Sequence, residues 1–121
     1  MPVIIFYQQA CGATPYKTFL SNIRDNRTRK RLGIKVQSTL SSDARHHCKR
    51  LPCGNRHIYE IKLVGKSGEL GGYRVYFGVF GNDIIVVLNA GGKSKKGQQN
   101  KDIKQAEKFY DDFSNRRNSY D

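Results

Sequence analysis

The stretch YRVYFGVFGNDIIVVLN, residues 73–89, decides the fold that this sequence predicts. Apolar side chains alternate with other side chains over residues 73–80, and an apolar run occupies residues 83–89, so both segments are expected to be strands. Between them, Gly81 and Asn82 form a two-residue turn of the kind that favours positive φ. The sequence therefore predicts an antiparallel hairpin.

Two further strands are expected on either side of this hairpin in the chain. Residues 58–64 show the same period of two, and a glycine-rich loop at 65–72 leads from them into the hairpin. Residues 3–7 form a short run of β-branched and aromatic side chains, which is typical of a strand. The meander formed by the last three strands can bury one face against helices.

Three helices complete the predicted order. Thr14 and Pro15 provide a hydroxyl cap and a proline for the first helical turn, and residues 28–40 and 103–113 show the helical period. The order β-α-α-β-β-β-α predicts an α+β class, with a small, antiparallel-dominated sheet packed against helices. The apolar stripes are Tyr16, Phe19, Leu20 and Ile23, then Leu32, Val36 and Leu40, then Ile103, Ala106, Tyr110 and Phe113.

The charge of the chain points to a polyanionic partner. Its 121 residues include 22 Lys and Arg against 10 Asp and Glu, a formal charge of +12. Nucleic acid is the first candidate and an acidic protein partner is the alternative. No run approaches the roughly 18 apolar residues that span a bilayer, and three cysteines without a framework spacing suit a reducing cytoplasm. We expect one cytoplasmic domain over residues 1–121, with a tail that frays from about residue 115.

Alternation also predicts which side chains share a face of the sheet. The apolar sets are expected to face the helices, which leaves Glu60, Lys62, Arg74 and Tyr76 on an uncovered face. Cleavage of RNA by its own 2′-hydroxyl needs a proton acceptor, a cation at the developing charge and a proton donor. An arginine can hold two phosphate oxygens, and an exposed tyrosine can stack on an unpaired base. A merely solvated sheet face is the alternative.

Four segments carry a resemblance to a known family: YEIKL at 59–63, GYRVYF at 72–77, VVLNAGGKS at 86–94 and KDIKQA at 101–106. Together they resemble the addiction-module killer proteins, which are HigB-like members of the RelE/ParE toxin superfamily. The combination is more specific than any one piece. The resemblance covers roughly residues 14–113, because residues 16–25 are also similar to the family's first helix.

The resemblance implies a RelE-like α+β domain that cleaves messenger RNA without a metal or other cofactor, in many members on the translating ribosome. It also implies a cognate antitoxin that is encoded beside the toxin. An antitoxin with a helix-turn-helix domain is one alternative. In RelE-like members, catalysis rests on basic residues that match Lys62 and Arg74, and Lys93 matches the lysine that follows the last strand. Arg74 is then expected to stabilise transition-state charge, Lys62 to handle phosphate or a proton, and Glu60 to act as general base.

The sequence departs from the family pattern at several positions. Glu60 stands where RelE has a lysine, which leaves the general base open. The tyrosine that serves RelE near its C-terminus has no secure counterpart, because Tyr110 falls on an apolar stripe. Asp102 is a candidate acid or base, or else a helix cap. Two rival functions stay open: a ParE-like gyrase inhibitor without nuclease activity, and a decayed toxin that keeps only antitoxin or RNA binding.

Basic residues elsewhere are the expected contacts to RNA phosphates. Lys95 and Lys96 follow Lys93 at the end of the last strand. A denser cluster begins the second helix, and it fits RNA phosphates, an acidic antitoxin segment or a solvated helix face. Its members are Arg24, Arg27, Arg29, Lys30 and Arg31.

Residues 45–57 bring together Cys48, Cys53 and three histidines. Zinc accepts such ligands, but the usual C-x₂-C spacing is absent, so no metal is expected there. A basic loop that touches ribosomal RNA and a plain solvated loop both remain open.

Overall fold

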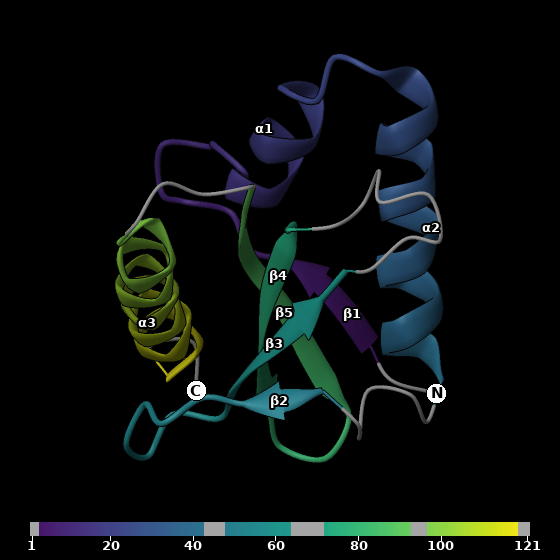
Figure 1. Ribbon diagram of the computed structural model, residues 1–121. Helices are drawn as coiled ribbons and strands as arrows, with labels where there is room; N and C mark the ends of the chain where they lie inside the picture. Colours follow the sequence, from purple (N-terminus) through teal and green to yellow (C-terminus); the bar gives the residue numbers. More distant parts are fainter. Residues whose placement is uncertain (1–2, 43–47, 64–71, 93–96, 119–121) are drawn as a thin grey trace.

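Three helices and five strands make up the part of the chain that the computed structural model describes, residues 3–42, 48–63, 72–92 and 97–118. The class is α+β, as the sequence predicts. In chain order the elements are β1 (Val3–Phe6), α1 (Pro15–Ser21), α2 (Asn26–Ser41), β2 (Lys49–Arg50), β3 (Ile58–Lys62), β4 (Arg74–Phe80), β5 (Ile84–Gly91) and α3 (Gln98–Asn118) (Figure 1).

The strands form one mixed sheet in the order β1-β5-β4-β3-β2. β1 runs parallel to β5, whereas the other neighbouring strands are antiparallel. The predicted hairpin is confirmed, because β4 and β5 pair antiparallel, but the predicted two-residue turn is wrong. Phe80 pairs with Ile84, so the connection has three residues, 81–83, and only Gly81 among them has a positive φ, +65°. Only glycine adopts this conformation without strain, which explains the residue at that turn.

Local sequence explains where the first two helices begin. Pro15 occupies the first turn of α1, where its missing N–H has no helical partner to lose. Thr14 holds the N-cap position, but its hydroxyl makes no capping hydrogen bond, so the predicted hydroxyl cap is wrong. Asp25 caps α2 by accepting from the backbone N–H of Arg27 and Thr28. The buried stripe of α2 is Thr28, Leu32, Val36 and Leu40.

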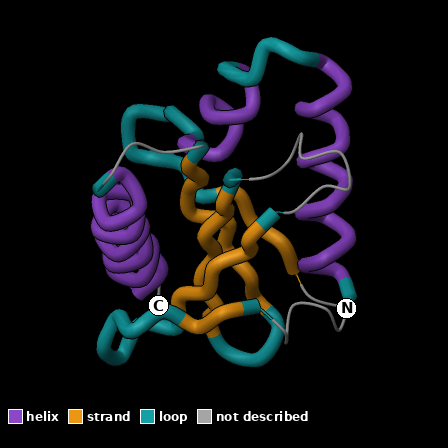
Figure 2. Tube along the Cα trace, viewed as in Figure 1, coloured by secondary structure: helices purple, strands orange, loops and turns teal. Residues whose placement is uncertain are grey.

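Helices cover both faces of the sheet (Figure 2). α1 and α2 lie on one face, where Leu32, Val75 and Phe77 belong to one apolar core. α3 lies on the other face, over a second core that includes Ile58 and Phe109. The expectation of an uncovered sheet face is therefore wrong, because one long amphipathic helix shields the side that alternation alone left open.

Two element boundaries also differ from the prediction. α3 begins at Gln98, five residues before the helical period expected over 103–113, and it continues past residue 115, where fraying was expected. Its first turn carries no apolar residue, so no helical period marks it in the sequence. The segment 45–57, expected to be a loop, contains β2, whose two residues are too few to show alternation. Residues 43–47 and 64–71, the latter including most of the glycine-rich loop, lie outside the described residues.

A β-bulge in β5 changes which side chains reach α3. Tyr76 pairs with Asn89, but the next residue, Phe77, pairs with Val87, so Leu88 is the extra residue. Strict alternation would turn Asn89 away from Leu88, whereas the bulge directs both side chains to the α3 face. Leu88 enters the second core, and Asn89 reaches the backbone of α3.

Candidate functional site

Polar side chains gather under the N-terminal half of α3. Arg74 Nε lies 3.4 Å from Glu60 Oε1, and Gln99 donates a 3.2 Å hydrogen bond from Nε2 to Glu60 Oε2. The side chain of Glu60 is 5% exposed and that of Arg74 is 22% exposed. Both oxygens of this buried carboxylate are therefore engaged, and its charge holds the guanidinium at the rim. We call Glu60, Arg74, Tyr76, Asn89, Gln99 and Asp102 the polar cluster.

Strand register explains why residues so distant in sequence meet here. Across β3 and β4, Glu60 pairs with Tyr76 and Lys62 pairs with Arg74. Across β4 and β5, Tyr76 pairs with Asn89. Side chains directly opposite one another in antiparallel strands share a face and lie within contact range. The hydrogen-bonding of three rigid strands thus positions most of the polar cluster.

Asp102 completes the polar cluster from α3. It lies in the second turn of the helix, so it is not the helix cap that was the alternative reading. Gln98 donates a 3.0 Å hydrogen bond to its Oδ1, and Asn89 Nδ2 donates a 3.1 Å bond to its backbone oxygen. A Cβ placed on Gly91 would collide with the Asp102 carboxylate. Glycine at position 91 therefore permits this close approach of helix and strand.

Three buried polar atoms of the cluster have no hydrogen bond to a described residue: Arg74 Nε, Tyr76 Oη and Asn89 Oδ1. Burial raises the pKa of the Tyr76 hydroxyl, and the charges of Glu60 and Asp102 raise it further, so this group keeps its proton. A buried polar group without a partner costs about 1–3 kcal/mol. Arg74 Nε faces the Glu60 carboxylate, which leaves Tyr76 Oη and Asn89 Oδ1 as two such atoms at one place, and a polar ligand would satisfy them.

Lys62 lies beside the polar cluster but projects into solvent. It is exposed, and it is paired in register with Arg74. It also borders a cavity of about 350 Å³ at the edge of the sheet, which Lys35 of α2 and Lys49 of β2 line as well. The Glu60 carboxylate lines this cavity too, but it is paired with Arg74, so the three lysines give the cavity a net positive charge.

The structure brings together some of the predicted site residues and separates others. Tyr76 is 0% exposed, so the prediction that it stacks on a base is wrong, because α3 covers it. Lys93, Lys95 and Lys96 lie outside the described residues.

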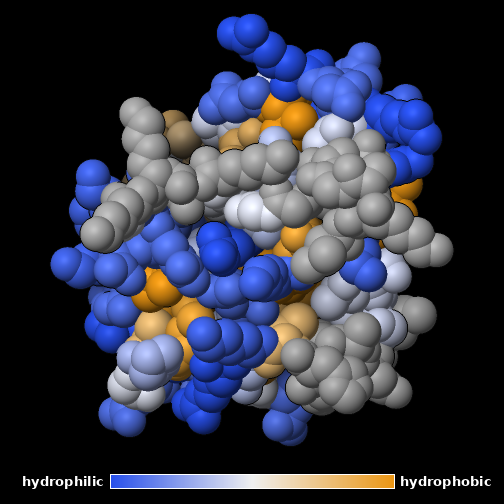
Figure 3. All heavy atoms as spheres, in the orientation of Figure 1, coloured by the Kyte–Doolittle hydropathy of each residue, from blue (hydrophilic) through white to orange (hydrophobic). Residues whose placement is uncertain are grey.

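The predicted basic cluster lies at the start of α2. Arg27, Lys30 and Arg31 are exposed, whereas Arg29 is half-buried and donates a 3.2 Å hydrogen bond from Nη1 to the backbone oxygen of Ile23. Figure 3 shows hydrophilic side chains over the connection between α1 and α2, at the top of the view. One arginine of the cluster thus has a structural role, and the others are accessible to a partner.

The Cys/His-rich segment is only partly described. Cys53 is buried, and this burial raises the pKa of its thiol to about 11, with Glu107 contributing. Within the described ranges no group of three His, Cys, Asp or Glu side chains could hold a metal ion. His46 and His47 lie outside those ranges.

Sequence reasoning missed two members of the polar cluster. Asn89 falls on the α3 face only because of the bulge, which no sequence pattern marked. Gln99 lies in a helical turn that precedes the period expected over 103–113. The one signal in the sequence was Asn89 itself, because asparagine is depleted in strands and this one ends an otherwise apolar strand.

A scan of the chain against models of protein families finds no match, and neither does a search of the curated proteins. No helix among the described residues combines the length and apolar character needed to cross a membrane. Function has to be argued from the site itself.

Proposed function

We propose that this protein is a RelE/ParE-type toxin that cleaves messenger RNA on the ribosome without a metal and is silenced by a cognate antitoxin. The observation that carries the proposal is Arg74, held by the buried Glu60 at the rim of the polar cluster and next to Lys62. The formal charge of +12 supports it. So does the element order, which contains the expected β-α-α-β-β-β-α with β2 added.

The proposed reaction uses the RNA's own nucleophile. The 2′-oxygen of one nucleotide attacks the adjacent phosphorus, and the bond from phosphorus to the 5′-oxygen of the next nucleotide breaks. The 2′-hydroxyl loses a proton and the leaving 5′-oxygen gains one, which yields a 2′,3′-cyclic phosphate and a 5′-hydroxyl. Arg74 and Lys62 stabilise the negative charge that develops on the phosphate oxygens.

The burial of Glu60 suggests a different role from the general base expected from sequence. Both of its oxygens already have partners, Arg74 and Gln99, and the carboxylate is hidden from solvent. We therefore assign Glu60 to positioning Arg74. Asp102 is half-buried and is the other carboxylate of the polar cluster, so we assign it the proton from the 2′-hydroxyl.

The flanking positive surface fits the rest of the substrate. Lys35 and Lys49 share a cavity with Lys62, which suits phosphates that neighbour the cleaved bond. Such contacts orient a strand without reading its sequence. Salt should weaken them, because each neutralised phosphate releases counterions on binding.

Primer extension on a reporter messenger RNA after brief induction tests the proposal. Wild-type protein should create new 5′ ends, and Lys62→Ala should reduce their rate of appearance by about 100-fold, the typical loss for one group that stabilises developing charge. Lys62 is exposed, so its removal leaves the fold intact. Lys108→Ala is the matched control, because it removes an exposed lysine of α3 that lies six residues beyond Asp102, the last residue of the polar cluster in the chain.

Two further arms identify the substrate and the rival function. New ends that disappear when translation is blocked show that cleavage depends on the ribosome. Growth arrest without new ends overturns the nuclease proposal, and inhibition of supercoiling by purified gyrase would then support a gyrase inhibitor. Absence of both arrest and new ends would leave a decayed toxin.

A further inference from the structure

A pocket of about 300 Å³ opens beneath the connection between α1 and α2, on the opposite face of the sheet from the polar cluster. Phe19 and Tyr73 provide its aromatic walls, with ring centroids 5.8 Å apart and planes inclined by 80°. Ile23 adds an apolar surface that is 8% exposed. The volume is at the lower end for small-molecule sites, so the pocket suits one planar group better than an extended ligand.

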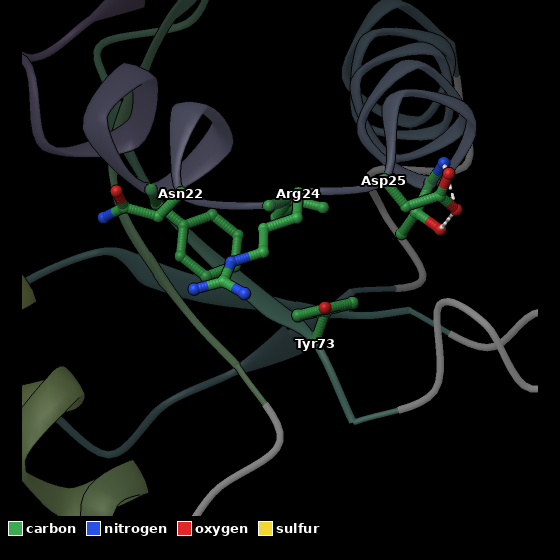
Figure 4. A pocket seen from close by; sticks show the side chains of 7 residues that line it. Asn22, Arg24, Asp25 and Tyr73 are labelled. Carbon is green, nitrogen blue, oxygen red and sulfur yellow. Dashed lines mark hydrogen bonds between the residues drawn. The ribbon is translucent and has the colours of Figure 1, made fainter.

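Arg24 and Asn22 are two polar residues that line this aromatic pocket. Figure 4 shows Arg24 extending into it, with Asn22 on one side and Tyr73 on the other. Among the described residues, Arg24 forms no ion pair and the Asn22 amide forms no hydrogen bond. Asp25 also borders the pocket, but its carboxylate turns towards α2 and bonds to Thr28, with a 2.6 Å hydrogen bond from the threonine hydroxyl. The available polar groups are thus a guanidinium and an amide.

The pocket is adjacent to the polar cluster through the chain itself. Tyr73 directly precedes Arg74, and alternation sends the two side chains to opposite faces of the same sheet end. Gly91 and Gly92 at the end of β5 also face opposite sides of the sheet. A Cβ on Gly91 would meet Asp102 on the α3 side, whereas a Cβ on Gly92 would lie 3.5 Å from the Tyr73 ring. Arg74 and the pocket thus lie at the same end of the sheet, on its two faces.

We propose that Phe19, Asn22, Arg24 and Tyr73 bind one unpaired base of a single-stranded RNA, next to the nucleotide whose phosphate lies at Arg74. Unpaired bases stack on aromatic rings and guanidinium planes, and amide groups bond to their edges. A second phosphate is the poorer occupant, because the aromatic walls offer it no partner and Asp25 adds a negative charge at the border. The inference rests on the proposed function, since it takes RNA as the substrate.

The test uses short single-stranded RNAs of one mixed sequence, 2′-O-methylated to prevent cleavage. In each RNA of the set, the base is removed from one position and the sugar-phosphate backbone is kept. For wild-type protein, removal of the base at one position should weaken binding by about tenfold, within the range for loss of one stacked base. In Arg24→Ala that same removal should have little further effect. Tyr73→Leu, which keeps an apolar side chain but removes the aromatic face, should behave in the same way.

Arg27→Ala is the matched control, because Arg27 is equally exposed and three residues from Arg24. It should weaken binding of every RNA in the set to the same degree and preserve the position dependence. If Arg24→Ala behaves like Arg27→Ala, Arg24 contacts a phosphate and the base pocket is overturned. Equal binding of every RNA by wild type also overturns it.

The cleavage assay separates this inference from the proposed function. Messenger RNA cleavage without a base-dependent position means that the nuclease stands and the pocket fails. A base-dependent position that Arg24→Ala abolishes, in a protein that cleaves no RNA, means that the pocket stands and the nuclease fails.

Discussion

The two halves of the sheet face under α3 differ in whether their buried polar groups have hydrogen-bond partners. Towards the C-terminal end of α3, Phe80 packs 4.5 Å from Tyr110 and 4.8 Å from Phe113, measured between ring centroids. Towards the N-terminal end lies the polar cluster. We call Tyr7, Phe80, Phe109, Tyr110 and Phe113 the aromatic half.

The tyrosines show the difference most clearly. In the aromatic half, Tyr7 donates a 2.5 Å hydrogen bond to Asp112, and Tyr110 Oη accepts one of 3.3 Å from the backbone N–H of His57. In the polar cluster, Tyr76 is fully buried, but its hydroxyl has no hydrogen bond to a described residue. One helix thus covers a half that stabilises the fold and a half whose polar atoms remain available. Departures from satisfied packing are expected at functional sites.

The largest effect should come from truncating the aromatic half. Phe109 is 6% exposed and its ring stacks on Tyr7 at 4.7 Å. Phe109→Ala should lower the free energy of unfolding by about 3–5 kcal/mol, since it removes buried area and leaves a cavity. Asn89→Ala, the matched truncation in the polar cluster, should cost about 1 kcal/mol, because it removes one hydrogen bond. Urea unfolding midpoints measure both, and equal losses would contradict the division into halves.

A smaller effect should come from breaking the ion pair of the polar cluster. Arg74→Ala leaves the Glu60 carboxylate buried and unpaired, which should cost about 3 kcal/mol of unfolding free energy. Glu60→Gln in the same chain removes that charge and should recover part of the loss. The double-mutant cycle, measured by urea unfolding, gives the coupling energy directly. A coupling near zero would mean that Glu60 does not hold Arg74.

The two tyrosines provide a finer comparison. Tyr7→Phe removes a hydrogen bond to a carboxylate that is itself partly exposed, so it should cost about 1 kcal/mol of stability. Tyr76→Phe removes a buried hydroxyl without a protein partner, so it should be neutral or stabilising by up to about 1 kcal/mol. Thermal unfolding of the two variants beside wild type decides between these outcomes. A clear loss in Tyr76→Phe would show that this hydroxyl is satisfied in solution.

Much of the fold could be predicted from local patterns. Alternation placed Glu60, Lys62, Arg74 and Tyr76 on one side of the sheet, and the register confirms this grouping. The same pattern could not show that α3 covers that side, because coverage depends on where a distant helix packs. The error therefore concerned burial, and it reversed the expected accessibility of Tyr76 and Glu60.

The site was harder to predict than the fold for a related reason. Asn89 joins the polar cluster through a bulge, and Gln99 joins it from a helical turn without an apolar residue. Tyr73 was expected only as one of the apolar side chains facing the helices, yet it also lines the pocket with Arg24. These placements arise from strand register and from the close approach permitted at Gly91, which are tertiary features without a short-range signature.

The smallest expected effect is a pH dependence in the aromatic half. Burial and the bond to Asp112 raise the pKa of Tyr7 from 10.0 to about 12. Above pH 10 the unfolded chain loses this proton while the folded chain keeps it, so the contribution is complete below pH 10 and disappears as the pH rises through 12. Tyr7→Phe should therefore reduce the fall in unfolding free energy across this interval, which urea unfolding at pH 10 and pH 12 measures.

Tyr16 tests whether the cause is burial or the carboxylate. Its pKa is also raised to about 12, but by burial alone, on the other face of the sheet. Asp112→Asn should reduce the part of the fall in unfolding free energy with pH that Tyr7 contributes. The part that Tyr16 contributes, which Tyr16→Phe removes, should stay the same. If Asp112→Asn and wild type have the same slope in urea unfolding between pH 10 and 12, burial alone holds the Tyr7 proton. The aromatic half would then owe its stability to packing rather than to its hydrogen bond.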